Sequence, residues 1–240
     1  MVYRNPFERV ILAVGSPYGA LLLLLAVMLL VYPFLGTHWA ANWIFDIVTL
    51  GLVAASLLVI HGKGFAFYLS LLLGSSAFIA GFLGRSMGVA SAYPFGAGLR
   101  ALFMAYLIIV IFRDIMRRRN ITFDAVLGAC CVFILLGLSF GSAYDLLEWL
   151  VPGSFSIPAV PQSIESVFGR MSTEFNLLYF SMVTMATVGF GDIVPVAAPA
   201  RSLAALEGLL GQLYLAIIIA RLVGLEIASR MQDSGSRNGN

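Results

Sequence analysis

The chain has 240 residues, of which 60% are hydrophobic and only 11% are charged, and its mean hydropathy is +0.97. Soluble domains average about 25% charged residues, so this composition excludes a disordered chain and argues against a water-soluble globular protein. A formal net charge of +2 disfavours a nucleic-acid-binding protein, and the adjacent Cys130 and Cys131 suit neither a disulfide framework nor a metal cluster. An integral membrane protein is the class that remains.

Six segments are long and apolar enough to cross a bilayer, which takes about 20 mostly apolar residues in a helix. They are residues 17–35, 41–60, 65–83, 98–116, 121–147 and 199–229. We therefore predict an all-α integral membrane protein with six transmembrane helices.

The cations indicate the orientation of these spans. With the N-terminus inside the cell, most of them fall on the cytoplasmic side, as the positive-inside rule expects. The cytoplasmic set is Arg4, Arg9, Lys63, Arg113, Arg117, Arg118, Arg119, Arg230 and Arg237, and the outer loops carry Arg85, Arg170 and Arg201. An even number of spans returns the C-terminus to the same side. We expect both termini in the cytoplasm and the protein in the inner (plasma) membrane.

The segment of about fifty residues between spans five and six is not a simple loop. It opens with Pro152, Pro158 and Pro161 and continues with an amphipathic run from Ser172 to Met185. At about 1.5 Å per residue this run reaches only about 20 Å, too short to cross the bilayer. We predict a re-entrant helix here, with Glu174 in its first turn, where the helix dipole favours a negative charge.

The motif T-M-A-T-V-G-F-G-D at residues 184–192 follows this run directly. It resembles the selectivity filter of potassium channels, whose common form is T-x-x-T-V-G-Y-G-D. Six spans with the motif between five and six resemble bacterial one-pore-loop potassium channels of the voltage-gated-like superfamily, and residues 121–230 resemble the small ion-channel pore-domain family. The resemblance implies a homotetrameric, potassium-selective channel with passive conduction. It divides the chain into a sensor-like domain (1–116), a pore domain (117–230) and a short cytoplasmic tail (231–240).

The residue types in the motif suit this chemistry, because K⁺ must exchange its hydration shell for protein oxygens. The predicted K⁺ ligands are the backbone carbonyls of Thr187, Val188, Gly189 and Phe190, with the Thr187 hydroxyl as the innermost ring. Successive carbonyls point the same way only if the handedness of the backbone alternates. Glycine adopts positive φ without penalty, which accounts for Gly189 and Gly191. One chain supplies one strand, so a closed ring of oxygens requires about four chains.

Further residues are predicted to support the filter: Asp192, Tyr179, Phe180, Thr184 and Glu207. The family often has two tryptophans where Tyr179 and Phe180 stand and a tyrosine where Phe190 stands, so a hydrogen bond common in the family would be an apolar contact here. The Tyr179 hydroxyl is expected to reach Asp192. Glu207 is expected to hydrogen-bond the short helix, for example at Thr184, or to extend to the outer interface.

The last span is expected to line the pore. Gly211 lies nineteen residues after Asp192, where the family often has a hinge glycine, although close helix contact is the alternative role. One helix face carries Gln212, Ala216, Ile219 and Val223, and we assign this face to the pore.

Span four lacks the arginine at every third residue that a voltage-sensing helix has. Arg100 lies clearly within it, whereas Arg113 is near its inner end. We therefore expect no strong voltage sensing. Asp46 in span two and Arg100 both lie near the outer ends of their helices, and they are predicted to form an ion pair.

Two alternatives to a potassium-selective channel stay open: a weakly selective cation channel, and a non-conducting regulatory or sensory membrane subunit. The intact T-V-G-F-G favours selectivity, because it retains all the carbonyl rings. No nucleophile–base or metal-ligand constellation suggests an enzyme. No cofactor is expected besides K⁺ as the permeant ion, and the expected partners are further copies of the chain and membrane lipids.

Overall fold

The computed structural model describes residues 16–31, 47, 49–54, 64–85, 91–118, 122–159 and 173–237. The helices are α2 (Pro17–Val31), α4 (Phe65–Arg85), α5 (Ala92–Arg117), α6 (Phe123–Leu150), α8 (Thr173–Met185) and α9 (Ala198–Arg237). Residues 47 and 49–54 are also helical. Two short strands, β1 (Phe155–Ser156) and β2 (Val194–Pro195), pair antiparallel. The described part of the chain is mostly helical, in agreement with the predicted all-α class.

Four of the described helices are long and apolar enough to cross a bilayer: Phe65–Gly84, Ala92–Arg117, Phe123–Leu150 and Ala198–Leu225. They correspond to predicted spans three to six. α2 covers the first predicted span as far as Val31, and the second is described only at residues 47 and 49–54. The rest of both spans, including Asp46, lies outside the described residues. The count of six spans therefore stays a prediction.

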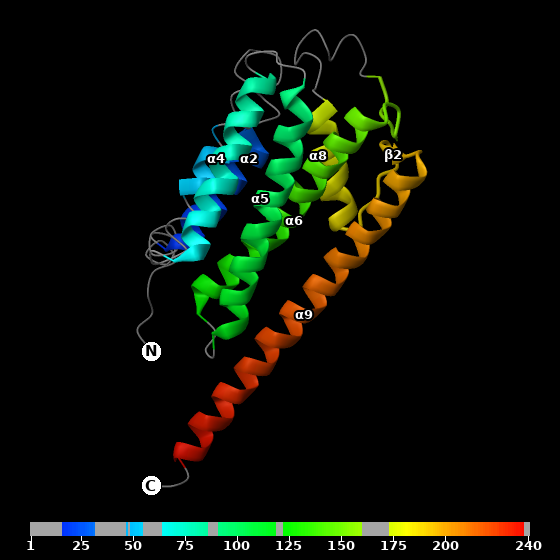
Figure 1. The fold of residues 1–240 in the computed structure, drawn as a ribbon. Helices are drawn as coiled ribbons and strands as arrows, with labels where there is room; N and C mark the ends of the chain where they lie inside the picture. The colour runs from blue at the N-terminus through cyan, green and yellow to red at the C-terminus, as the bar shows by residue number, and fades with distance from the viewer. Residues whose placement is uncertain are drawn as a thin grey trace.

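Two helices, α5 and α9, extend furthest beyond their predicted limits. α5 begins at Ala92 rather than at residue 98, because Pro94 falls in the first turn, where a backbone N–H would have no intrahelical acceptor. α9 continues to Arg237 rather than ending near residue 229. Figure 1 shows this continuation projecting beyond the other helices.

α5 lies beside α6 of the same chain (Figure 1). The connection between them, residues 118–122, is too short for any other arrangement than an antiparallel hairpin. The Ser139 hydroxyl of α6 donates to the Ala101 carbonyl of α5 at 3.1 Å. One apolar core runs across the predicted domain boundary and includes Tyr18, Leu25, Leu107, Ile111, Val132, Leu135, Tyr214 and Ile218. α2 and α5 of the N-terminal half thus pack against their own chain's α6, and α4 packs against α5.

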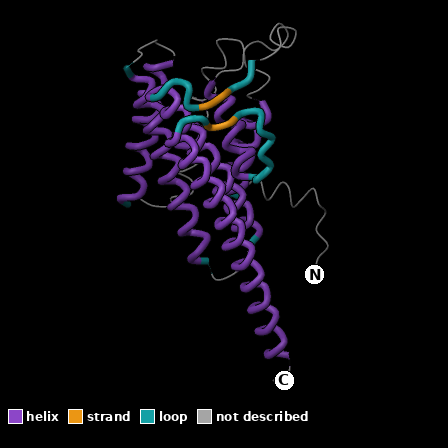
Figure 2. Tube along the Cα trace, turned by 90° about the vertical axis from the view of Figure 1, so that its right-hand side faces the viewer, coloured by secondary structure: helices purple, strands orange, loops and turns teal. Residues whose placement is uncertain are grey.

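The chain passes along α8 and then returns to the end of the bundle at which α8 begins. β1 follows α6 and β2 precedes α9, and their pairing joins Phe155 to Pro195 and Ser156 to Val194. α8 itself has 13 residues, so it extends about 20 Å along the bundle. The chain therefore enters and leaves at the same end, where Figure 2 shows the strand pair.

α8 packs closely on α6 because two glycines of α6 have no side chain at the contact. A Cβ at Gly137 would lie 2.7 Å from Cε of Met182, and a Cβ at Gly141 would lie 3.1 Å from Cα of Leu178. The Ser181 hydroxyl of α8 donates to the Gly137 carbonyl at 2.7 Å. G-x-x-x-G spacing of this kind is common where membrane helices approach closely.

Candidate functional site

α8 ends in a pair of hydrogen bonds that leads the chain into residues 187–191, here called the filter segment. The Val188 N–H donates to the Val183 carbonyl, and the Thr187 N–H donates to the Thr184 carbonyl, both at 3.0 Å. These are the two bonds of a Schellman motif, whose left-handed residue is usually glycine. Here that residue is Thr187, with a φ of 56°.

Positive φ recurs at every second residue of the filter segment. It is 56° at Thr187, 55° at Gly189 and 79° at Gly191, and Thr187 is the only non-glycine residue with positive φ in the described part of the chain. This alternation of handedness is what allows successive carbonyls to point the same way. Sequence reasoning anticipated the two glycines but missed Thr187, because the left-handed region costs a non-glycine residue about 1–2 kcal/mol.

The filter segment makes few contacts with the rest of its own chain. Every residue from Ala186 to Asp192 is exposed, with Val188 at 54% and Phe190 at 69%. No heavy atom lies within 4 Å of a Cβ built on Gly189. A strained residue such as Thr187 persists only where its surroundings hold it, and one chain alone leaves this segment uncovered.

The two aromatic residues of α8 that were predicted to support the filter contact different partners. Tyr179 stacks on Phe190, with ring centroids 6.4 Å apart and planes 3° from parallel, and its hydroxyl interacts with the Asp192 carboxylate. Phe180 instead packs on Tyr144 of α6, with ring centroids 5.4 Å apart. Adjacent helix residues project about 100° apart, so both side chains cannot face the filter segment. Within this chain the aromatic contact of Phe190 is with Tyr179.

A buried carboxylate joins three helices beside the filter segment. Glu207 of α9 has no exposed surface, and the Tyr144 hydroxyl of α6 donates to its Oε2 at 2.5 Å. The Ser181 hydroxyl of α8 contacts its Oε1, sharing its one proton between this oxygen and the Gly137 carbonyl. The sequence suggests Thr184 as the partner on α8, whereas the structure places the bond one turn earlier, at Ser181. Both carboxylate oxygens are paired within the chain, so Glu207 does not extend to the outer interface.

Gly211 lies against the C-terminal end of α8. A Cβ at this position would be 3.1 Å from both the carbonyl oxygen and the Sδ atom of Met185, which is fully buried. α9 runs through Gly211 without a break. The structure thus shows close helix contact at Gly211, one of its two expected roles, and the hinge stays a prediction.

α9 has a covered face and an open face. The covered face carries the buried residues Glu207, Gly211, Tyr214 and Ile218. The residues predicted to line the pore are all exposed: Gln212, Ala216, Ile219 and Val223. At about 100° per residue the two sets lie on roughly opposite sides of the helix. The predicted pore-lining face is therefore uncovered by its own chain.

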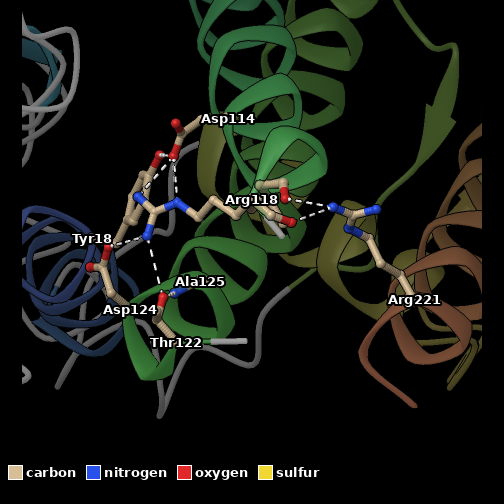
Figure 3. A network of polar contacts seen from close by, with 8 residues as sticks. Tyr18, Asp114, Arg118, Thr122, Asp124, Ala125 and Arg221 are labelled. Atoms are coloured by element: carbon tan, nitrogen blue, oxygen red, sulfur yellow. Dashed lines mark hydrogen bonds and ion pairs between the residues drawn. The ribbon is translucent and has the colours of Figure 1, made fainter. Parts of the chain in front are cut away.

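A polar network surrounds the C-terminal end of α5 and is shown in Figure 3. Arg118 donates to the carboxylates of Asp114 and Asp124, each at 3.0 Å, and its guanidinium lies 5.3 Å from the centre of the Tyr18 ring. The Tyr18 hydroxyl of α2 donates to Asp114 at 2.7 Å. Thr122 begins α6 as its N-cap, accepting from the Ala125 N–H. Three helices thus meet at this end of α5.

Arg221 of α9 joins the same network from the other side (Figure 3). Its Nη2 donates to the carbonyls of Met116 at 2.6 Å, Arg118 at 2.8 Å and Ile115 at 3.3 Å. The last carbonyls of a helix have no intrahelical donor, and a cation there is favoured by the helix dipole. Arg221 therefore fastens α9 to the end of α5.

Sequence reasoning missed Arg221, Tyr144 and Ser181. An ionisable residue within an apolar span is a functional candidate by default, so Arg221 had a usable signal. Hydroxyl side chains on apolar helices are common, and nothing in the pattern singles out Tyr144 or Ser181.

Two comparisons with known proteins fall on the part of the chain that contains this site. Residues 132–225 match the model of a family described as ion channel. Over 105 residues the chain is 31% identical to the inward rectifier potassium channel Kirbac3.1 of Paramagnetospirillum magnetotacticum, covering 40% of this chain and 29% of that protein. The chain thus matches less than a third of this relative's length. No solved structure matches the chain.

The residues matched by the family model run from α6 to α9 and contain α8 and the filter segment. Together with the four helices long and apolar enough to span a bilayer, the matches indicate a multi-pass membrane channel rather than an enzyme.

Proposed function

We propose that the chain is one subunit of a potassium-selective channel that passes K⁺ down its gradient through the filter segment. The observation that carries the proposal is the positive φ at Thr187, Gly189 and Gly191 within T-V-G-F-G. Carbonyls aligned in this way can replace the hydration shell of K⁺. The match to an ion-channel family and the similarity to a potassium channel support the same activity. The ligands would be the carbonyls of residues 187–190.

Four copies of the chain would complete the site. One strand offers oxygens to only one side of an ion, and the exposed filter segment has room for neighbours. α9 also carries exposed apolar residues that suit contact with other subunits and lipids: Leu206, Leu209, Leu213, Leu215, Ile217, Ile219 and Val223. In such a tetramer the C-terminal ends of the four α8 helices would direct their partial negative charges toward a central cation.

In the membrane, α8 would be a re-entrant helix and the chain would cross six times, with both termini in the cytoplasm. The return of the chain to one end of the bundle supports the re-entrant path, and the distribution of cations supports the orientation. The exposed side of α9 would line the pore, with Gln212 just below the filter segment. Ile219 and Val223 would form a deeper apolar ring, which can stop ions by dewetting.

The deciding experiment is reconstitution into liposomes with a K⁺ gradient and a flux dye, repeated with Na⁺. Gly189→Ala should abolish K⁺ flux, because an L-residue resists a φ of 55° and a Cβ would crowd the ring of strands. Gly153→Ala is the matched control. Gly153 also has a positive φ, 83°, and no atom lies within 4 Å of its Cβ position, but it lies outside the filter segment.

Wild-type flux from assembled Gly189→Ala protein would contradict the filter assignment. Equal K⁺ and Na⁺ flux through the wild-type protein would support the weakly selective cation channel instead. Intact tetramers that pass neither ion would support the non-conducting subunit.

Cysteine scanning from residue 211 to 225, with Cys130 and Cys131 replaced, tests the pore face. Block by a water-soluble thiol reagent should occur at positions 212, 216, 219 and 223. Block at 213, 217 and 221 would mean a rotated helix, in which Arg221 could not keep its contacts with the end of α5.

A further inference from the structure

Arg100 of α5 is buried, with only 1% of its surface exposed. Its Nη2 lies 2.7 Å from Oε1 of Glu174 and 3.8 Å from Oδ2 of Asp145. Glu174 is in the first turn of α8, and Asp145 is near the end of α6. Arg100 therefore joins three helices, and one of them leads directly into the filter segment.

The carboxylates around Arg100 are themselves held in place. The Tyr93 hydroxyl, at the start of α5, lies 2.9 Å from both carboxylate oxygens of Asp145, which is also buried. Glu174 lies at the positive end of the α8 dipole, which favours its negative charge. We call these four residues, Tyr93, Arg100, Asp145 and Glu174, the Arg100 cluster.

These surroundings oppose movement of Arg100 through the membrane field. Removing one partner from a buried ion pair is strongly destabilising, because it leaves an uncompensated charge away from water. If α5 carried Arg100 inward, Glu174 and Asp145 would both lose this guanidinium. A gating charge needs successive partners along its path, whereas the two carboxylates that contact Arg100 in the described part of the chain lie at one level of the bundle.

The position of Glu174 connects this cluster to the filter. α8 is a single rigid helix of 13 residues, and its last turn forms the Schellman motif that sets the φ of Thr187. A displacement of the first turn of α8 therefore moves the start of the filter segment as well. Close packing against Gly137 and Gly141 leaves α8 little freedom to absorb the displacement locally.

We infer that Arg100 is a positioning residue for the filter: it holds the first turn of α8 to α5 and α6, so that the N-terminal half of the chain acts on the filter segment through α8. This inference rests on the proposed function. It assigns Arg100 a fixed structural charge, as the expected ion pair did, and names Glu174 and Asp145 as partners.

The first test compares K⁺ and Na⁺ flux through tetramers selected by size-exclusion chromatography. Arg100→Gln keeps the length of the side chain and removes its charge, and the K⁺/Na⁺ flux ratio should fall by about tenfold. Arg100→Lys keeps the charge and should restore much of the ratio. Arg113→Gln, at an exposed position of the same helix, is the matched control and should leave the ratio unchanged.

Flux measured over a range of membrane potentials separates positioning from voltage sensing. Arg100→Gln should leave the voltage dependence unchanged while lowering the ratio. An unchanged ratio with an altered voltage dependence would identify Arg100 as a gating charge and overturn the inference. If Arg100→Gln does not assemble, the double variant with Glu174→Gln removes both charges together and is measured in its place, with the same lowered ratio expected.

The second test does not depend on conduction. Arg100→Gln and Glu174→Gln should each lower the thermal unfolding midpoint by about 10 °C, and the double variant should lower it no further, because both disrupt one pair. Additive losses would contradict the pairing and the inference with it. Non-additive losses in a protein that passes no K⁺ would instead contradict the proposed function, while leaving the attachment of α8 to α5 in place.

Discussion

The two ends of α5 carry arginines in contrasting surroundings. The Arg100 side chain is 2% exposed and contacts the buried Asp145 and the 11%-exposed Glu174, whereas the Arg118 side chain is 31% exposed and contacts the partly exposed Asp114 and Asp124. Breaking a buried pair costs about 3–5 kcal/mol. A solvent-exposed pair contributes only about 0.2–1 kcal/mol. The end of α5 near α8 is thus firmly attached, while the end near Arg118 can exchange its partners at little cost.

This difference assigns separate tasks to the two ends. The firmly attached end lies next to the helix that sets the filter segment, where a displacement of a fraction of an ångström would alter the carbonyl positions. The other end meets α9 through Arg221, on the side of α9 opposite to the face predicted to hold the apolar ring. We expect an arginine on backbone carbonyls to form and break its contact more readily than a buried pair of opposite charges.

The largest expected effect is on the stability of the Arg100 cluster. Arg100→Gln should lower the free energy of unfolding by about 3–5 kcal/mol, because it removes one partner from a buried ion pair. Arg118→Gln should lower it by less than about 1 kcal/mol. Chemical denaturation of both variants in the same detergent measures the difference. Equal losses would remove the contrast between the two ends.

The loss of unfolding free energy caused by Arg221→Gln should fall between the losses caused by Arg118→Gln and Arg100→Gln. Arg221→Gln weakens charge-assisted hydrogen bonds to backbone carbonyls, which are worth about 1.5–3 kcal/mol. Amide hydrogen exchange should become faster in the last turn of α5 and stay unchanged around Arg100. Faster exchange at both ends would show that α5 opens as one unit and that its ends are not separate.

Two glycines on α9 test the same contrast between tightly packed and open surroundings. Gly211→Ala places a Cβ 3.1 Å from the Met185 carbonyl and should be destabilising by about 1–3 kcal/mol. No atom lies within 4 Å of a Cβ at Gly224, so Gly224→Ala should stabilise the helix by about 0.5–1 kcal/mol. Thermal unfolding of the two variants checks the opposite signs. A neutral Gly211→Ala would mean that α9 is not tightly packed on α8.

A change in salt concentration should produce the smallest effect on the stability of these variants. The Debye length falls from about 10 Å at 0.1 M to about 3 Å at 1 M salt, so the small stability loss caused by Arg118→Gln should vanish at high salt. The loss caused by Arg100→Gln should persist, because water and ions do not reach the buried pair. Unfolding curves at both salt concentrations test this, and a salt-sensitive Arg100 variant would indicate that the cluster is open to solvent.

The sequence was sufficient to locate the short helix α8 and the apolar spans three to six, because each has a local signature of length or hydropathy, and it anticipated the positive φ of Gly189 and Gly191. It also placed Glu207 near α8. Local sequence patterns predict which residues share one face of a helix. This rule groups the predicted pore-lining residues together on the open face of α9.

What the sequence could not provide was the identity of neighbouring helices. Its pairing of Arg100 with Asp46 stays a prediction, because Asp46 lies outside the described residues, and it explained Glu174 by the helix dipole alone. The contacts of Arg100 with Asp145 and Glu174 join residues 45 and 74 positions apart, and no periodicity reports such a distance. The positive φ of Thr187 was missed for another reason: it contradicts the local preference of threonine, and hydrogen bonds at the end of α8 overcome that preference.

The short connection between α5 and α6 predicts how variant and wild-type subunits behave when they are expressed together. In the proposed tetramer each N-terminal half would stay beside its own α6 and α8, so each subunit would position its own strand. A ring of carbonyls requires all of its strands, so one displaced strand would disrupt the whole path. We therefore expect an Arg100 variant expressed together with the wild-type chain to be dominant, with lowered selectivity in every such tetramer that contains a variant subunit.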